Sequence, residues 1–268
     1  MSPVRPIKKL GQHFLRDTSL ARKIVESAEI GPDDVIIEIG PGEGTLTRPL
    51  MDSSAGNITA IEIDSRMSDI LNGLFGADER FKLVQEDILK VDLNTVLVGP
   101  GKVRIFGNLP FYITSPILFR LLEFRENIQD IYITVQKEVA ERLASEPGRK
   151  AYGIPSVLYQ AFSEVRILFD ISRKAFFPVP QVDAAVLQIR FLEKPVHAID
   201  DEDLFRAIVR KTFGQRRKML RNTLKGDIGP EELCDIVDLT QRPEELSVIQ
   251  FIKLTNYLSE KIHRRLSD

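Results

Sequence analysis

The segment Asn108-Leu109-Pro110-Phe111 directly follows an apolar run, Val103–Gly107, that predicts a buried strand. A side-chain amide, a proline and an aromatic ring therefore come together where a strand ends. Asn108 offers a side-chain carbonyl oxygen, and Pro110 keeps its backbone carbonyl although it has no N–H to donate. Phe111 offers a face for stacking. These groups suit a flat ring that carries an amino group, and they predict a base amine as nucleophile.

A glycine-rich loop and three acids predict a ligand site beside this segment. Glu38 precedes the loop Gly40–Gly44, in which glycine lets the backbone turn tightly and approach a ligand. Glu62 ends the next predicted strand, where a carboxylate can accept both hydroxyls of a ribose. Asp87 follows the third predicted strand, where its carboxylate can accept a hydrogen bond from an adenine amino group. Taken singly, each acid is more often a solvated loop carboxylate, but all three are expected at the edge where open α/β sheets bind ligands. Carboxylates without basic phosphate-binding residues favour S-adenosylmethionine over NAD.

The elements that position these groups alternate between strand and helix patterns. Five strands are predicted over residues 35–39, 58–63, 81–85, 103–106 and 128–135. Helices are predicted from about 45 and over 65–74, 115–124 and 137–144. Two later strands, 164–169 and 184–191, have little helix between them and are expected to form an antiparallel edge. The expected fold is therefore α/β, with a doubly wound, mostly parallel, seven-stranded Rossmann-like sheet that has an antiparallel edge.

A second domain is expected after residue 195. Lys194–His197 is typical of a linker, and from Asp201 onward only helical patterns occur, at about 201–213, 215–225, 230–239 and 248–266. We therefore predict a catalytic domain over 1–195 and a small all-helical, RNA-binding domain over 196–268. Within the first, Ser145–Gly153 is rich in polar residues and turn signals, and predicts a mobile loop near the site.

Basic residues gather in two segments, although the net charge is only −2. The range Phe205–Lys225 holds eight basic residues and no acid, and residues 1–23 hold six basic residues against one acid. A solvated helix face would explain one such run, but the absence of acids favours a local surface for a polyanion. The residues predicted to touch RNA are Arg149, Lys150, Arg210, Lys211, Arg216, Arg217, Lys218 and Arg221.

The composition is ordinary for a soluble protein, with 268 residues of which 43% are hydrophobic and 28% charged. No apolar run is long enough for a membrane span, and the N-terminus lacks a secretory apolar segment. The single cysteine, Cys234, lies in an apolar-periodic segment and is expected in the core. No cluster has the spacing of metal ligands. We therefore expect a cytoplasmic monomer without a metal or a membrane partner.

Taken in order along nearly the whole chain, these motifs resemble the rRNA adenine N6-dimethyltransferases of the small subunit. The resemblance rests on the segments Lys9–Leu15, Glu38–Gly44, Asn108–Phe111, Gln136–Arg142, Phe176–Asp183 and Phe213–Asn222, with Glu62 and Asp87 between them. It implies an enzyme of ribosome biogenesis that uses S-adenosylmethionine to dimethylate two adjacent adenosines in a hairpin loop near the 3′ end of 16S rRNA. The implied partner is 16S rRNA in the immature 30S subunit.

The resemblance also implies roles for individual residues. The cofactor site would be lined by Gln12, His13, Leu15, Gly40, Gly42, Glu62, Asp87 and Asn108. Catalysis would involve Asn108, Pro110 and Phe111, with the Phe176 ring as the second wall around the target base and Phe177 as a packing residue. His13 stands where the family often has asparagine, and Phe111 where it often has tyrosine.

Three other readings stay open. The first is methylation of 23S rRNA in the manner of the macrolide-resistance enzymes, which share the catalytic motifs. The second is an RNA-binding assembly factor without catalysis, against which the intact Asn108–Phe111 segment and Glu62 argue. The third is an NAD-dependent oxidoreductase, for which no histidine or tyrosine pair suits a hydride site.

Overall fold

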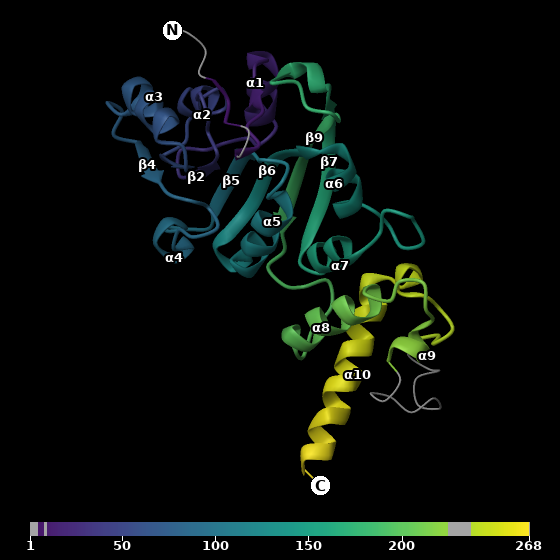
Figure 1. Cartoon of the computed structure of the whole chain (residues 1–268). Coiled ribbons are helices and arrows are strands. Elements are labelled where there is room, and N and C mark those ends of the chain that lie inside the picture. The colour runs from purple at the N-terminus through teal and green to yellow at the C-terminus, as the bar shows by residue number, and fades with distance from the viewer. Residues whose placement is uncertain (1–4, 8–9, 225–236, 268) are drawn as a thin grey trace. The chain divides into compact units, whose positions relative to one another are not determined.

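The central sheet of the computed structural model is mostly parallel and has seven strands, in the order β4-β3-β2-β5-β6-β9-β7 (Figure 1). Its strands are β2 (Val35–Ile39), β3 (Asn57–Glu62), β4 (Phe81–Gln85), β5 (Val103–Asn108), β6 (Ile128–Gln136), β7 (Ser163–Ile171) and β9 (Ala184–Phe191). The strands β2, β3, β4, β5 and β6 pair in parallel, and β9 lies antiparallel to β6. The predicted α/β fold with an antiparallel edge is confirmed.

The structure describes residues 5–7, 10–224 and 237–267, the last three of these by their backbone alone. Lys8, Lys9, Lys225 and Cys234 lie outside the described residues, as does most of the predicted helix 230–239. The expectation that Cys234 is a core residue therefore stays a prediction.

Helices cover both faces of the sheet, so its central strands are buried throughout. All five residues of β2 are buried, as expected for a parallel strand with helices on each side. Figure 1 shows α1, α2 and α3 along one side of the sheet and α4 and α5 along the other. The helices of this part of the chain are α1 (Thr18–Glu26), α2 (Thr47–Met51), α3 (Ser65–Phe75), α4 (Leu93–Val96), α5 (Thr114–Glu123) and α6 (Lys137–Leu143).

The strand order reverses between β2 and β5. The chain runs outward from β2 through β3 to β4, and then returns to add β5 on the other side of β2. Loops that follow the two strands at such a switch point diverge and leave a crevice at the carboxyl edge of the sheet. The loop Gly40–Gly44 and the segment Asn108–Phe111 both leave from this point, which is why two distant motifs meet.

The opposite end of β5 carries a buried ion-pair network. Arg104 donates to both oxygens of Asp130 on β6, at 2.9 and 2.7 Å, and to Asp34 at 2.9 Å. Arg104 and Asp130 are each 4% exposed. Burial raises the pKa of Asp130, and the guanidinium of Arg104 opposes that rise. The network joins the starts of β2, β5 and β6 at the edge away from the crevice.

A second, two-stranded sheet was not predicted from the sequence. The strand β1 (Phe14–Leu15) pairs antiparallel with β8 (Phe176–Phe177), so that Phe14 lies opposite Phe177 and Leu15 opposite Phe176. The backbone N–H of Arg16 extends the pairing by donating to the carbonyl of Ala175 at 2.8 Å. This small sheet joins the segment before α1 to the segment before β9.

By its packing, the chain divides into two compact units: residues 1–140 with 166–191, and residues 141–165 with 192–268. The second unit contains α7 (Ile154–Gln160), α8 (Glu202–Phe213), α9 (Leu220–Thr223) and α10 (Val248–Ser267). It therefore includes residues 141–165, which the predicted boundary at 195 places in the first domain. Aromatic contacts explain this, because Tyr152 packs edge-on against Phe213 and Phe162 against Phe205.

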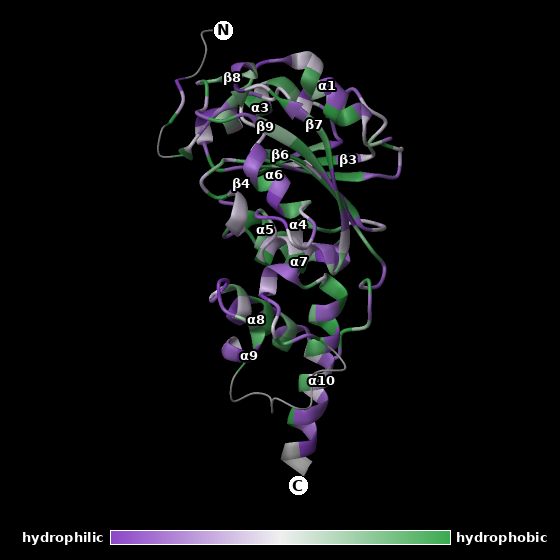
Figure 2. Cartoon of the chain, turned by 90° about the vertical axis from the view of Figure 1, so that its right-hand side faces the viewer, coloured by the Kyte–Doolittle hydropathy of each residue, from purple (hydrophilic) through white to green (hydrophobic). Residues whose placement is uncertain are grey.

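One other prediction for the second unit needs correction. The helix expected over 215–225 is only the short α9 within the described residues. The segment Ser145–Gly153 has a backbone contact within the unit, because the N–H of Gly148 donates to the carbonyl of Glu244 at 2.7 Å, and its mobility stays a prediction. Figure 2 shows hydrophobic and hydrophilic residues alternating along α10, as expected for a helix with one buried side.

No helix among the described residues combines the length and the apolar character that a bilayer span requires.

Candidate functional site

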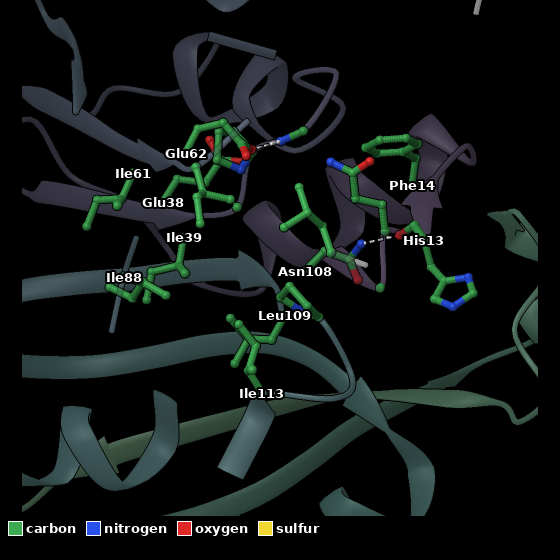
Figure 3. Close-up of a pocket in the computed structure, with 18 of the residues that line it drawn as sticks. His13, Phe14, Glu38, Ile39, Ile61, Glu62, Ile88, Asn108, Leu109 and Ile113 are labelled. Atoms are coloured by element: carbon green, nitrogen blue, oxygen red, sulfur yellow. Dashed lines mark hydrogen bonds between the residues drawn. The ribbon is translucent and has the colours of Figure 1, made fainter. Parts of the chain in front are cut away.

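A cavity of about 280 Å³ lies at the carboxyl ends of β2, β3, β4 and β5 (Figure 3). Its lining includes every residue predicted for the cofactor, namely Gln12, His13, Leu15, Gly40, Gly42, Glu62, Asp87 and Asn108. It also includes Pro110 and Phe111, but not Phe176. The structure thus brings the predicted residues together, while the role of each stays a prediction.

Glu62 lies at the end of β3 with its carboxylate fixed by backbone donors. Its Oε1 accepts from the N–H of Asp64 at 2.8 Å, and its Oε2 accepts from Gly42 at 3.1 Å. Glu62 is 5% exposed, and burial raises its pKa although these backbone donors hold it down. A carboxylate has about four acceptor positions. Two therefore remain for donors of a ligand in the cavity.

Glu38, at the end of β2, is the most deeply buried acid of the cavity and lies beside Glu62 (Figure 3). Its Oε2 has no hydrogen-bond partner among the described residues, and neither has the nearby Thr47 hydroxyl. Burial raises the pKa of Glu38 to about 8, and the charge of Glu62 adds to the rise. An unpartnered buried carboxyl oxygen that lines a cavity suits a donor or a cation of a bound ligand.

The glycine loop after β2 can form only because its glycines accept left-handed backbone angles. Gly40 has a φ of +67° and Gly42 a φ of +55°. A β-carbon on Gly42 would lie 2.9 Å from the ring of Phe14. The loop therefore lies directly against β1, and the N–H of Gly42 donates to the carboxylate of Glu62.

The amide of Asn108 is held in one orientation. Its Nδ2 donates to the backbone carbonyl of His13 at 2.7 Å (Figure 3). No donor among the described residues reaches its Oδ1. The orientation leaves the acceptor oxygen of Asn108 available in the cavity, as the proposed contact with an amino group requires.

The backbone carbonyl of Pro110 is less available than the sequence predicts. It accepts from the Thr114 hydroxyl at 3.0 Å and from the N–H of Ile113 at 3.2 Å, in the first turn of α5. Both lone pairs are therefore in use. A substrate donor reaches this oxygen only when the Thr114 hydroxyl turns away.

His13 joins Phe111 to the segment that follows β8. Its ring stacks on Phe111 with centroids 5.6 Å apart and an interplanar angle of 28°. Its Nδ1 lies 2.7 Å from the carbonyl oxygen of Pro178. Because a carbonyl oxygen only accepts, Nδ1 carries the proton. His13 thus contacts the cavity through both its backbone and its ring.

The expected roles within the Phe176–Phe177 pair are corrected by the structure. Phe176 is 2% exposed and packs in the core with Leu15, whereas Phe177 is 48% exposed. The alternation of side chains along β8 sends the two rings to opposite sides. Phe176 is therefore the packing residue of the pair, and in this structure it does not form a wall of the cavity.

Two further polar residues shape the cavity. The Nε2 of Gln12 donates to Asp64 at 2.9 Å, and its Oε1 accepts from the N–H of Ile7 at 2.8 Å, so Gln12 ties the N-terminal segment to the end of β3. Asp87 accepts from the N–H of Leu89 at 2.9 Å through Oδ1.

Sequence reasoning missed Tyr112, whose ring stands over Gly11. A β-carbon on Gly11 would lie 2.6 Å from this ring. Burial and the charge of Asp87 raise the pKa of Tyr112. The position of Tyr112 directly after Phe111 in the sequence could have indicated that it lines the cavity. The apolar walls Ile63 and Ile88 were missed too, because they read as ordinary strand and turn residues.

The residues predicted to bind RNA all lie in the second unit. Seven of them are exposed: Arg149, Lys150, Arg210, Lys211, Arg217, Lys218 and Arg221. Arg216 differs, because its guanidinium pairs with Glu244 and donates to the carbonyl of Lys150 at 2.7 Å. Arg216 therefore holds the unit together as well as adding charge. The described residues contain no group of three or more side chains placed to hold a metal ion.

Comparison with known proteins gives consistent results. The family model described as "Ribosomal RNA adenine dimethylase" matches residues 5–260. The "Ribosomal RNA small subunit methyltransferase A" of Pseudomonas syringae pv. syringae is 40% identical over 259 residues, which is 96% of each chain. The protein of the same name from Parabacteroides distasonis is 40% identical over 271 residues, covering 100% of this chain and 99% of its own.

Two solved structures share the fold over nearly the whole chain. A dimethyladenosine transferase from Plasmodium falciparum has a TM-score of 0.79 at 24% identity and covers 93% of this chain and 98% of its own. The 23S rRNA methyltransferase ErmE has a TM-score of 0.75 at 26% identity, with 92% and 99% covered.

Proposed function

This chain belongs to the ribosomal RNA adenine dimethylase family, and we propose on that basis that it dimethylates N6 of two adjacent adenosines of 16S rRNA, using S-adenosylmethionine. The adenosines lie in a hairpin loop near the 3′ end, in the immature 30S subunit, and the enzyme acts as a cytoplasmic monomer. The relatives that are 40% identical carry names of small-subunit methyltransferases, which supports this substrate over 23S rRNA.

The residues of the cavity fit S-adenosylmethionine by their chemistry. Glu62 keeps acceptor positions for the two ribose hydroxyls, and Asp87 has a carboxylate for an adenine amino group. The unpartnered Oε2 of Glu38 offers a buried oxygen to a hydrogen-bond donor of the ligand. Among the described residues, no lysine or arginine lines the cavity, which disfavours a dinucleotide. When bound, this cofactor supplies an electrophilic methyl group.

The observation that carries the proposal is the fixed amide of Asn108. Because Nδ2 is engaged by the carbonyl of His13, Oδ1 is presented as an acceptor. The lone pair of adenine N6 is delocalised into the ring, so N6 is a poor nucleophile. An acceptor that holds an N6 hydrogen favours a more tetrahedral nitrogen, whose lone pair can attack. Preorganised positioning and electrostatics then supply most of the rate, and no strong base is needed.

The target adenine must leave its stack to reach this amide, and aromatic contact offsets the cost of extrusion. Phe111 lines the cavity directly after the Asn108 amide, and we assign this contact to its ring. The exposed basic residues of the second unit would bind rRNA phosphates without reading sequence.

One experiment tests the substrate and the reaction together. The protein is incubated with labelled S-adenosylmethionine and immature 30S subunits, and the methylated nucleotides are mapped. We expect two adjacent N6-dimethyladenosines near the 3′ end of 16S rRNA. Label that enters 23S rRNA alone, in a parallel reaction with 50S precursors, would support the resistance-type alternative. An absence of label in both would support a non-catalytic assembly factor.

A further inference from the structure

Phe177 presents a large exposed ring on a rigid support. It is 48% exposed, although its neighbour Phe176 is 2% exposed. The pairing of β8 with β1 fixes its backbone, with Phe14 opposite Phe177. The ring adds little to the core, and its position is set by hydrogen-bonded strands rather than by a loose loop.

An arginine lies against this ring. The guanidinium carbon of Arg16 is 5.4 Å from the ring centroid of Phe177. Arg16 also pairs with Glu43 at 3.2 Å, yet its side chain stays 41% exposed. Aromatic rings and arginine planes are the surfaces on which proteins stack unpaired RNA bases.

The charge around Phe177 favours a polyanion over an apolar protein surface. Arg173 and Lys174 directly precede β8, and both are exposed. Arg173 is held in place, because its side chain donates to the carbonyl of Gln181 at 3.0 Å and its N–H to Asp183 at 2.9 Å. Arg16 lies against the exposed ring, and Arg173 and Lys174 add two exposed positive charges to the segment that leads into it.

This ring also lies next to the cavity. Phe14, which lines the cavity, is opposite Phe177 in the small sheet. His13 lines the cavity too, and its Nδ1 donates to the carbonyl of Pro178 at 2.7 Å. The exposed ring is therefore separated from the wall of the cavity by a single strand pairing.

We propose that Phe177 and Arg16 form a stacking site for the unpaired nucleobase next to the adenine in the cavity. The inference rests on the proposed function, since extrusion of one adenine deprives its neighbour of a stacking partner. Where two adjacent adenosines are modified, the second adenosine is held on this site while the first is methylated.

The test combines a protein variant with an RNA variant. Small subunits are reconstituted with 16S rRNA whose 3′ segment is synthetic and joined by ligation, so that one nucleotide beside the target adenosine can be made abasic. For Phe177→Ala on the intact rRNA, we expect KM for the subunit to rise about fivefold or more. On the abasic rRNA, wild type and variant should have the same KM.

Three controls sharpen the result. Phe177→Trp, which keeps a stacking face, should restore KM. Val179→Ala removes a side chain of the same segment that is 57% exposed, and should change nothing. Binding of S-adenosylmethionine and the thermal midpoint of Phe177→Ala should match wild type.

A Phe177→Ala variant whose KM is unchanged, or is raised equally on intact and abasic rRNA, would overturn the stacking site. A failure of the proposed function is distinct from this, because wild type would then give no adenine methylation on intact rRNA. Direct binding of the two rRNAs to wild type and variant would still report on the stacking site in that case.

Discussion

At the scale of single residues, the site depends on polar atoms whose partners are decided by the backbone. Asn108 is oriented by a main-chain carbonyl, and Glu62 is fixed by two main-chain N–H groups. These groups need no reorganisation when a ligand binds, which is the condition for electrostatic stabilisation of a transition state.

Replacing Asn108 with alanine should abolish methyl transfer while S-adenosylmethionine still binds. The change removes the acceptor for the N6 hydrogen, and a lost preorganised acceptor typically costs 10²- to 10³-fold or more in kcat. Single-turnover transfer to 30S subunits and calorimetric titration of the cofactor measure the two effects separately. Transfer at the wild-type rate would refute the role assigned to Asn108.

The buried carboxyl of Glu38 should make stability depend on pH. Burial raises its pKa from 4.5 to about 8, so between these values the folded protein binds a proton that the unfolded chain has lost. The free energy of unfolding should therefore fall, for this group, as the pH rises from about 5 to 8. In Glu38→Gln this contribution is absent.

The measurement is the thermal midpoint of Glu38→Gln relative to wild type at several pH values. We expect the difference to shift in favour of the variant as the pH rises from 5 to 9. A difference that is independent of pH would show that Glu38 is not held protonated. The other titrating groups are common to both proteins and cancel in the comparison, except Glu62, whose charge interacts with that of Glu38.

At the scale of elements, the two ends of β5 contribute to different properties, one to stability and the other to the cavity. Arg104 near its start holds Asp130 and Asp34, and Asn108 at its end presents the amide to the cavity. Three residues of strand separate these groups along the chain, so stability and chemistry can be changed independently.

The variant Arg104→Met tests this separation. It leaves Asp130 buried without its partner, and breaking a buried pair in this way typically costs about 3–5 kcal/mol of stability. Chemical denaturation should show that loss, whereas affinity for S-adenosylmethionine should be unchanged while the protein is folded. The double variant Arg104→Met/Asp130→Asn should recover part of the stability; no recovery would mean that the loss does not come from an unpaired Asp130.

The sequence predicted the strands that have a recognisable hydrophobic pattern. It missed the short strands, which have no such pattern. The seven strands of the main sheet are apolar runs and were located to within a few residues. A strand of two residues, such as β1 or β8, shows no alternation, so only the tertiary pairing reveals it. For the same reason the Phe176–Phe177 pair was assigned the wrong way round. Gly40, Glu62, Asp87 and Asn108 line one cavity because they lie at the ends of consecutive strands at one edge, while their roles stay predictions.

At the scale of the whole molecule, chemistry and charge are divided between two units. The cavity belongs to the first unit, and the exposed basic residues predicted to bind RNA belong to the second. The net charge of −2 hides this division, so the distribution of charge and not its sum predicts the RNA partner.

Reversing the charge of Arg217 and Lys218 should weaken RNA binding and flatten its dependence on salt. Each phosphate contact that is lost reduces the slope of log Kd against log salt by about 0.7–0.9. Arg216 is left unchanged because it is paired with Glu244 inside the unit. Filter binding of 30S subunits at several salt concentrations gives the slope.

The matched control is Lys82→Glu/Lys102→Glu, which makes the same change in net charge at exposed positions of the first unit. It should leave the slope close to that of wild type. Equal slopes for both double variants would mean that net charge, and not a local surface, governs binding.

The hydrogen bond from Asn108 to residue 13 has a consequence for how this protein can diverge. The acceptor is a main-chain oxygen, which every amino acid carries, so a substitution at position 13 does not delete it. Histidine can replace the asparagine common in the family without loss of the amide's orientation. A substitution at position 108 does remove the bond, because the donor Nδ2 and the acceptor Oδ1 both belong to the side chain of Asn108. A change of side chain at position 13 therefore keeps this bond, whereas removal of the amide at position 108 deletes it.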